Sequence, residues 1–194
     1  KENYLCILCK DGRFKKVLYD DEMLKTNRAF TIIKTKKENE IINSFISKQN
    51  KILIILTSIG RLFKYKLNNE NIAPVSKQAQ GTILNKLFPR EEIISCCTCK
   101  TGDQIVIITK KGTFYRVKEN EIYNSYNSKL GYLDEKLQIK HDSYLSLITD
   151  NKYCEIITNK ERSAKINFSK LKINLNTKKY QIDFLNFEND EYIN

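Results

Sequence analysis

The sequence has few residues that end or break regular structure, and few side chains that perform chemistry. Among 194 residues there are six Gly, two Pro, one His and no Trp. No stretch approaches the roughly 18 consecutive apolar residues that a membrane-spanning helix needs, and the apolar run near the N-terminus is too short for a signal peptide. We therefore expect a soluble protein that has no membrane partner.

The six Cys residues do not form a convincing set of metal ligands. Cys6 and Cys9 have the spacing of a metal knuckle, but they lie in an alternating apolar run in which side chains three apart point to opposite faces. The three cysteines within residues 96–99 lie in a second strand-like run. We predict free, largely buried thiols in a reducing compartment, with no metal site.

The charge is strongly unbalanced toward the basic side. Lys and Arg outnumber Asp and Glu by 34 to 23, which gives a formal charge of +11 and a pI near 9.3. Such a balance favours a polyanionic partner such as nucleic acid. An AT-rich genome, which also enriches Lys, Asn and Ile, is the alternative explanation for part of this charge.

Four segments of the chain fall into one repeat of about 50 residues. They align on an anchor position occupied by Gly12, Gly60, Gly112 and Glu161, with spacings of 48, 52 and 49 residues. Five residues before the anchor every copy has Ile, and four residues after it every copy has Lys or Arg. This agreement is closer than composition alone would produce, so the chain is built from a repeated unit.

Each repeat reads as a β-hairpin whose turn ends at the anchor. In the fourth copy, which has lost the Gly, Asn159 is predicted to supply the positive φ of the turn. Between the hairpins lie further strand candidates, at 31–35 and 40–46 in the first unit and at 82–88 and 92–99 in the second.

About four strands in every 50 residues is typical of propeller-like blades. The predicted fold class is therefore all-β, a single propeller-like domain over 1–194 with about four blades, approximately 1–50, 51–101, 102–150 and 151–194. The formal charges of these units are +4, +5, 0 and +2, so the basic character lies mainly in the first half.

A set of motifs around the second hairpin resembles one known family. After the Gly60–Arg61 turn comes the segment 76–81, in which Ser76, Lys77, Ala79 and Gly81 match a Ser-Arg-x-Ala-x-Gly pattern. The matches that follow are Ile83, Asn85 and Leu87, then Glu91 and Glu92, then Thr109, Gly112 and Thr113. This arrangement closely resembles the C-terminal domain of DNA gyrase A and its topoisomerase IV counterpart, most clearly over residues 51–124.

The resemblance implies a β-pinwheel, a disc of blades that exchange strands with their neighbours, around whose basic rim duplex DNA bends. Cations that recur at one strand position suit phosphate neutralisation better than base reading, although Lys on a solvated strand edge has an equally good explanation as protection against edge pairing. The residues predicted to bind DNA are Arg13, Lys16, Lys25, Arg28, Arg61, Lys64, Lys77, Arg116, Lys129, Arg162, Lys165, Lys178 and Lys179.

One departure from the family pattern concerns DNA wrapping. In gyrase the connector of the first blade carries a Gly-rich basic box, Gln-Arg-Arg-Gly-Gly-Lys-Gly. The corresponding stretch 24–30 reads LKTNRAF and contains no Gly. Without Gly the backbone cannot freely adopt positive φ against a phosphate, so the sequence predicts binding of the weaker, topoisomerase IV kind or a degenerate gyrase box.

Neither a catalytic constellation nor a cofactor motif is present in the sequence. His141 is predicted to lie on a turn, and no phosphate-binding loop occurs. The resemblance implies a non-catalytic domain of an ATP-dependent topoisomerase, needing no cofactor of its own. It would act with double-stranded DNA, the rest of gyrase A and gyrase B, in the bacterial cytoplasm or a relict plastid such as the apicoplast. The alternative function is a propeller-like protein-interaction module that has lost DNA wrapping.

Overall fold

The computed structural model shows a chain made almost entirely of β-strands, which confirms the predicted all-β class. It describes residues 2–20, 23, 25, 29–35, 39–125, 130–133, 137, 139–150, 153–168, 180–181, 187–188 and 190–194. The 3₁₀ helix η1 (Glu119–Glu121) directly follows the third hairpin.

The four predicted hairpins are all present, and each pairs its two strands in antiparallel register. They are β1 (Asn3–Cys9) with β2 (Arg13–Tyr19), β4 (Ile52–Thr57) with β5 (Leu62–Lys66), β8 (Gln104–Thr109) with β9 (Thr113–Lys118), and β11 (Tyr153–Ile157) with β12 (Ser163–Asn167).

The hairpin turns share one conformation, in which the anchor residue has a positive φ. The φ angles are 84° at Gly12 and Gly60, 78° at Gly112 and 59° at Glu161. Each anchor N–H donates to the carbonyl three residues earlier, at 2.9–3.1 Å. This is a turn closed by a left-handed residue, as in three-residue hairpin loops. The prediction that Asn159 supplies the positive φ is wrong, because Glu161 itself adopts it.

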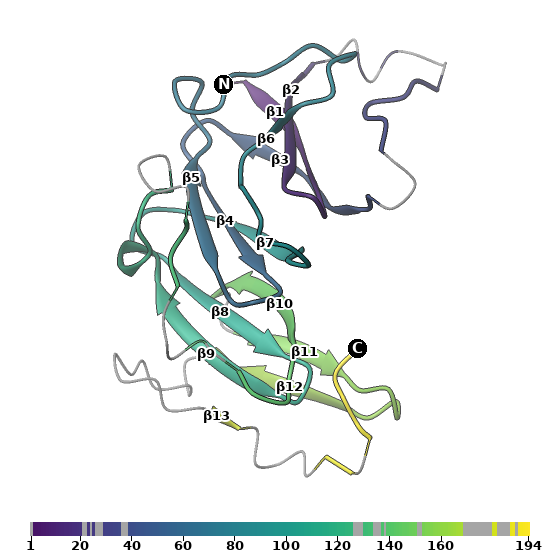
Figure 1. Cartoon of the computed structure of the whole chain (residues 1–194), viewed down its shortest axis with the longest axis vertical. Coiled ribbons are helices and arrows are strands. Elements are labelled where there is room, and N and C mark those ends of the chain that lie inside the picture. Colours follow the sequence, from purple (N-terminus) through teal and green to yellow (C-terminus); the bar gives the residue numbers. More distant parts are fainter. Residues whose placement is uncertain are drawn as a thin grey trace.

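Three of the hairpins are extended by a further strand on the first strand of the hairpin. These inner strands are β3 (Ile41–Lys48) on β1, β7 (Ile93–Cys99) on β4 and β10 (Tyr144–Thr149) on β8. The inner strands contact one another in succession, and the sheets follow each other along a curved arc (Figure 1). The first to fourth sheets are therefore ordered along the arc as in the sequence.

Strands are also exchanged between successive units. Strand β6 (Thr82–Ile83) comes after the second hairpin but pairs with β2 of the first sheet, and β13 (Tyr180–Gln181) comes after the fourth hairpin but pairs with β9 of the third. Isolated bridges place Asn124 and Tyr132 beside β5 in the same way. The contiguous blade ranges are thus approximate, since Thr82–Ile83 lies within the second range but belongs to the first sheet.

Apolar side chains fill the spaces between neighbouring sheets. Strand β4 is buried along its whole length because its two faces meet different neighbours. Leu53 and Ile55 pack toward Tyr4 and Cys6 of the first sheet. The opposite face of β4 packs against the third sheet in a second apolar layer, which includes Ile52, Ile54, Leu56, Ile105, Ile107 and Leu147. A third apolar layer lies between the third and fourth sheets and includes Val106, Ile108, Phe114, Ile156 and Ile166.

Two of the predicted strands differ in the structure. Residues 31–35 form no strand, and Ile33 packs instead on Ile7 and Cys9 at the outer face of the first sheet. Of residues 82–88 only Thr82–Ile83 pairs as a strand. Leu84 N–H still donates to the carbonyl of Gly12 at 3.1 Å, and the side chain of Asn85, which is buried, then donates to the hydroxyl of Tyr65 at 2.7 Å.

Candidate nucleic-acid interface

The basic residue that recurs four positions after each anchor connects successive sheets. Lys16 Nζ donates to the carbonyl of Leu67 at 2.8 Å, and Lys64 Nζ donates to the carbonyl of Glu119 at 3.1 Å. Arg116 donates to the carbonyl of Phe168 at 3.1 Å. Each acceptor lies seven residues after the anchor of the next unit. The repeated cation of one sheet therefore fixes the segment that leaves the return strand of the next sheet.

Lys16 is completely enclosed by these contacts. Its ammonium group also donates to Asn69 Oδ1 at 2.8 Å and Ile72 O at 3.0 Å, and it lies 4.4 Å from the centre of the Tyr4 ring. Burial lowers the pKa of this Lys. Because its three donors are satisfied inside the fold, Lys16 is not part of the exposed basic surface.

Lys64 and Arg116 are also engaged within the protein. Lys64 forms an ion pair of 2.9 Å with Glu119, and Arg116 pairs with Asp150. In contrast Lys165, at the same repeat position of the fourth hairpin, is exposed, with its ammonium 3.9 Å from the centre of the Tyr153 ring. The expected row of phosphate-binding cations at this strand position is thus reduced to one exposed member.

The Arg that follows the anchor makes a second repeated contact. Arg61 is 2% exposed and forms a bidentate pair with Glu91, at 2.8 and 2.5 Å. Burial alone would raise the pKa of Glu91, but hydrogen bonds from Arg61 and from the Phe88 N–H outweigh it and hold that pKa below its usual value. Arg61 also donates to the carbonyls of Leu130 and Lys86, at 2.7 and 3.0 Å. Arg61 is a structural cation and does not belong to the exposed surface.

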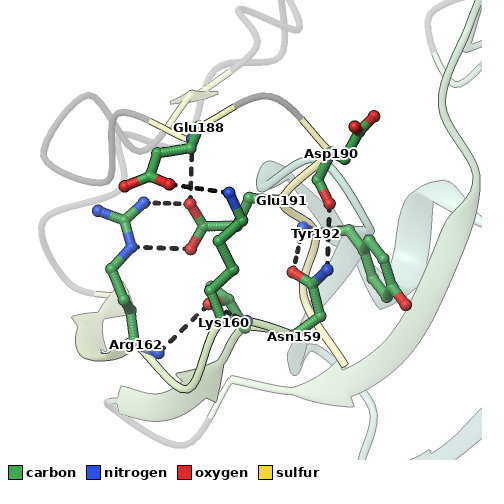
Figure 2. A network of polar contacts seen from close by, with 8 residues as sticks. Asn159, Lys160, Arg162, Glu188, Asp190, Glu191 and Tyr192 are labelled. Carbon is green, nitrogen blue, oxygen red and sulfur yellow. Dashed lines mark hydrogen bonds and ion pairs between the residues drawn. The ribbon is translucent and has the colours of Figure 1, made fainter.

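The same arrangement recurs around Arg162 in the fourth unit (Figure 2). Arg162 makes a bidentate pair with Glu191, whose carboxylate also accepts the Glu188 N–H at 3.0 Å. Lys160 bonds Glu188 at 2.8 Å on the exposed side of this network. The hydrogen bonds from Arg162 lower the pKa of Glu191 to about 2. Arg162, though predicted to bind DNA, is therefore committed to a carboxylate.

Cations on the outer edge of the first two sheets form a more accessible group. We call residues 76–91 the rim segment, because it carries β6 along the outer edge of β2 (Figure 1). Lys77, a predicted site residue, is partly exposed on it, with Asp20 4.0 Å away. Arg13, also predicted, donates to Gly81 O at 3.4 Å and is partly exposed.

Sequence reasoning missed three neighbouring cations. Lys86 and Arg90 are exposed on the rim segment, and Lys34 is exposed beside it, with its backbone N–H bonded to Gln80 Oε1 at 3.2 Å. They do not share one position of the hairpin repeat, so repeat periodicity could not identify them. The signal that was available was the formal charge of +4 over residues 1–50, which contain Lys34, and of +5 over residues 51–101, which contain Lys86 and Arg90.

Buried cations hold the rim segment in place from the inside. Lys15 is fully buried and donates to the carbonyl of Lys77 at 2.6 Å and to that of Ile32. Arg61 bonds the carbonyl of Lys86. Two residues that present a cation outward are thus each fixed through their own carbonyl, which gives the exposed charges a defined spacing.

Of the remaining residues predicted to bind DNA, the structure describes only one. Lys25 is exposed. Arg28, Lys129, Lys178 and Lys179 lie outside the described residues, as does most of the stretch 24–30 that corresponds to the Gly-rich box.

A second basic surface lies where the sheets turn from one inner strand to the next hairpin. A depression of about 510 Å³ is lined by Lys48, Lys51 and Lys100, together with Glu2 and Gln49. None of these three lysines is among the residues predicted from the sequence to bind DNA. Lys48 and Lys51 flank the short connection from β3 to β4, and the pairing of β4 with β7 brings Lys100 beside them.

The cysteines are free thiols, and most are buried. Burial raises the pKa of Cys6, Cys96 and Cys99 to about 12, which leaves them protonated and unreactive near neutral pH. Within the described part of the chain, no group of three or more His, Cys, Asp or Glu side chains could hold a metal ion. No helix in that part has the length and apolar character needed to cross a membrane.

The sequence is similar to one curated protein. No protein-family profile matches the sequence. The chain is 25% identical over 134 residues to DNA gyrase A of Borrelia hermsii, a match that covers 68% of this chain and 16% of that protein. The chain thus corresponds to a small part of this curated relative.

Solved structures with a similar fold are C-terminal domains of DNA topoisomerase IV, DNA gyrase A and ParC. The C-terminal domain of DNA topoisomerase IV matches with a TM-score of 0.75 at 18% identity, over 89% of this chain and 54% of that one. The DNA gyrase A C-terminal domain matches at 0.65 and 16% over 87% and 55%, and the E. coli ParC C-terminal domain at 0.56 and 13% over 87% and 66%. The predicted resemblance and the β-pinwheel fold are confirmed.

Proposed function

We propose that this chain is a DNA-binding accessory domain of a type IIA topoisomerase, similar to the C-terminal domain of gyrase A. It would bind and bend duplex DNA along its outer edge and so guide the segment that the enzyme transports. The chain itself would supply no bond-breaking chemistry and need no cofactor. Its partners would be double-stranded DNA, the rest of gyrase A and gyrase B.

The observation that carries this proposal is the rim segment with its neighbours. Exposed or partly exposed cations at Arg13, Lys34, Lys77, Lys86 and Arg90 lie on the outer edge of a curved fold, at an edge fixed from inside by buried cations. Phosphate contacts of this kind position DNA without reading its bases. Bending a site of 20–30 base pairs costs about 1–6 kcal/mol, which several such contacts would have to offset.

Many of the predicted cations are engaged inside the fold, so we expect the domain to neutralise only a few DNA phosphates. Lys16, Lys64, Arg61, Arg116 and Arg162 all bond partners within the fold. Fewer neutralised phosphates mean a weaker complex than a fully wrapped one. This supports binding of the topoisomerase IV kind. A bacterial cytoplasm or a relict plastid would both suit such a function.

The experiment that tests the proposal is ligation of nicked plasmid in the presence of increasing amounts of the protein, followed by measurement of linking number. A shift of constant sign would support chiral wrapping. DNA binding at low salt without a linking shift would support an electrostatic bending contact. Absence of both would overturn the DNA proposal and favour a protein-interaction module.

A further inference from the structure

The turn that ends the rim segment has the same construction as a turn in the fourth unit. In the rim segment the Glu91 N–H donates to the Phe88 carbonyl at 3.0 Å, and the Phe88 N–H donates to the Glu91 carboxylate at 2.7 Å. In the fourth unit Glu191 and Glu188 form the same two bonds, at 3.1 and 3.0 Å. Each carboxylate also accepts from the Arg that follows the anchor of its hairpin. Phe88 and Glu188 therefore occupy equivalent positions.

The two units differ in the pair of side chains that is exposed beside this turn. The residue before the anchor is Lys160 in the fourth unit and Ile59 in the second. Lys160 forms an exposed ion pair of 2.8 Å with Glu188 (Figure 2). At the equivalent positions the second unit has Ile59, which is 44% exposed, and Phe88, which is 50% exposed. We call these two residues the apolar pair, because they present apolar surface where the fourth unit presents two charges.

The ring of Phe88 is held in one orientation by its surroundings. The guanidinium carbon of Arg61 lies 4.2 Å from the centre of this ring. Pro89 followed by a positive φ of 64° at Arg90 is the pattern of a type II turn, which fixes the backbone on the other side. A side chain that is ordered before it meets a ligand loses little conformational entropy on binding.

Cations lie on both sides of Phe88 along the rim segment. Lys86 and Arg90 are exposed two residues before and two residues after it. The carbonyl of Lys86 is fixed by Arg61 at 3.0 Å, so the spacing of this cation from the ring is defined by the fold. An apolar group between two cations matches the surface of duplex DNA, in which stacked bases lie between two phosphate backbones.

We propose that Phe88, supported by Ile59, inserts between two stacked base pairs of the DNA that lies along the rim segment and kinks the duplex there. The proposal rests on the DNA-binding function proposed above. Apolar side chains that enter a base step from the minor groove partly unstack it and kink the duplex by about 20–90°. Lys86 and Arg90 would bind the phosphates that flank this step. The preferred step would be a pyrimidine–purine step, because such steps unstack most easily.

The charges around the apolar pair favour DNA over a second copy of this chain. A symmetric contact between two copies would bring the same surface of each copy together. Lys86 and Arg90 of both copies would then lie close to one another, and such a contact between like charges is unfavourable. A polyanion meets no such repulsion.

The test measures base stacking and bending in one complex of the full chain with DNA. The probe is a duplex of about 30 base pairs with a central TA step, in which 2-aminopurine replaces the adenine and the two ends carry fluorophores. 2-Aminopurine fluoresces more strongly when it is unstacked, and energy transfer between the ends reports the bend. We expect the fluorescence to rise on binding and the duplex to kink by about 20–90°.

The fourth unit supplies a matched variant. Combining Ile59→Lys with Phe88→Glu introduces the ion pair that the same turn carries in the fourth unit, and it leaves the net charge unchanged. We expect this double variant to bind DNA with the salt dependence of the wild type, while the rise in fluorescence and the kink are lost. Phe88→Leu, which keeps an apolar side chain, should retain both. Urea unfolding of the variants checks that they are folded.

The outcomes distinguish this inference from the proposed function. DNA binding without unstacking or a kink would overturn the insertion and leave the electrostatic contact in place. A fluorescence rise that persists in the double variant would exclude the apolar pair as the inserted group. Absence of DNA binding at low salt would overturn the proposed function and this inference with it. If the amide resonances of the apolar pair shift with protein concentration in the absence of DNA, the pair is an interface between copies.

Discussion

The ammonium group of Lys16 lies 2.8 Å from the carbonyl oxygen of Leu67, a residue 51 positions further along the chain. The same relationship joins Lys64 to Glu119 and Arg116 to Phe168. A cation that recurs in a repeat is therefore used here to connect sheets. Because a backbone carbonyl can accept from either Lys or Arg, the repeat keeps the charge across its copies and not one residue type.

Lys16 and Lys165 occupy the same repeat position in different surroundings, so they form a matched pair. Lys16→Met would leave the carbonyls of Leu67 and Ile72 without their buried donor, and we expect a loss of about 1–3 kcal/mol in the free energy of unfolding. Lys165→Met should change it by less than about 1 kcal/mol, because this side chain is exposed. Urea unfolding measures both. Equal effects would contradict an internal role for Lys16.

The buried pair of Arg61 and Glu91 should be costly to break from either side. We expect Arg61→Ala or Glu91→Ala to reduce the free energy of unfolding by about 3–5 kcal/mol, because each leaves a buried charge without its partner. The double variant should lose less than the sum of the two. A double-mutant cycle in urea checks this. As a control, the exposed pair of Lys160 and Glu188 should show much weaker coupling than the buried pair, because solvent screens it.

The pair of Arg162 and Glu191 predicts a particular dependence on pH. The pKa of Glu191 in the fold is about 2, below the ordinary value of 4.5, so the ionised carboxylate favours folding. Its contribution is complete above about pH 4.5 and is lost as the pH falls toward 2. Thermal unfolding of the wild type and Glu191→Gln should differ at pH 6 and converge near pH 2. A difference that stays constant over this range would rule out the assigned pKa.

Gly81 and Gly102 both have positive φ, 78° and 83°, but their surroundings differ. A Cβ at Gly81 would overlap the carbonyl oxygen of Phe14, whereas one at Gly102 meets nothing within 4 Å. Gly102→Ala should cost about 1–2 kcal/mol from backbone strain alone. Gly81→Ala should cost more and separate β6 from β2. Urea unfolding compares the two, and similar values would show that close packing at Gly81 is unimportant.

The proposed DNA contact predicts a change in salt dependence. Replacing Lys86 or Arg90 with Ala should lower the slope of log K against log salt concentration by about 0.9 for each cation removed, with stability unchanged. Lys140→Ala, at an exposed cation outside the rim segment, is the control. Fluorescence anisotropy with a duplex of about 30 base pairs, the upper end of the bent-site range, would measure the slopes. Slopes equal to that of the wild type would remove the rim segment from the interface.

The candidate site was predicted less well than the fold. Hairpins could be found because their apolar alternation and their turn residues are local, as at Gly12 and Gly60. Whether a cation is exposed to a partner depends on contacts with residues far away in the sequence. Lys16 and Lys165 are equivalent in the repeat, yet one is buried under the next sheet and the other is exposed. The sequence also offered Asn159 for a positive φ, although the turn geometry required it at Glu161.

The sequence by itself determined the repeat, the all-β class and the positions of the hairpins, because strand alternation and turn chemistry act over a few residues. Only the tertiary structure decided which cations remain exposed and which strands are exchanged between sheets. The physical reason is that a buried Lys or Arg needs acceptors, and here these lie about 50 residues away on the next sheet. Charge counted along the chain therefore overstates the charge that its surface presents to a partner.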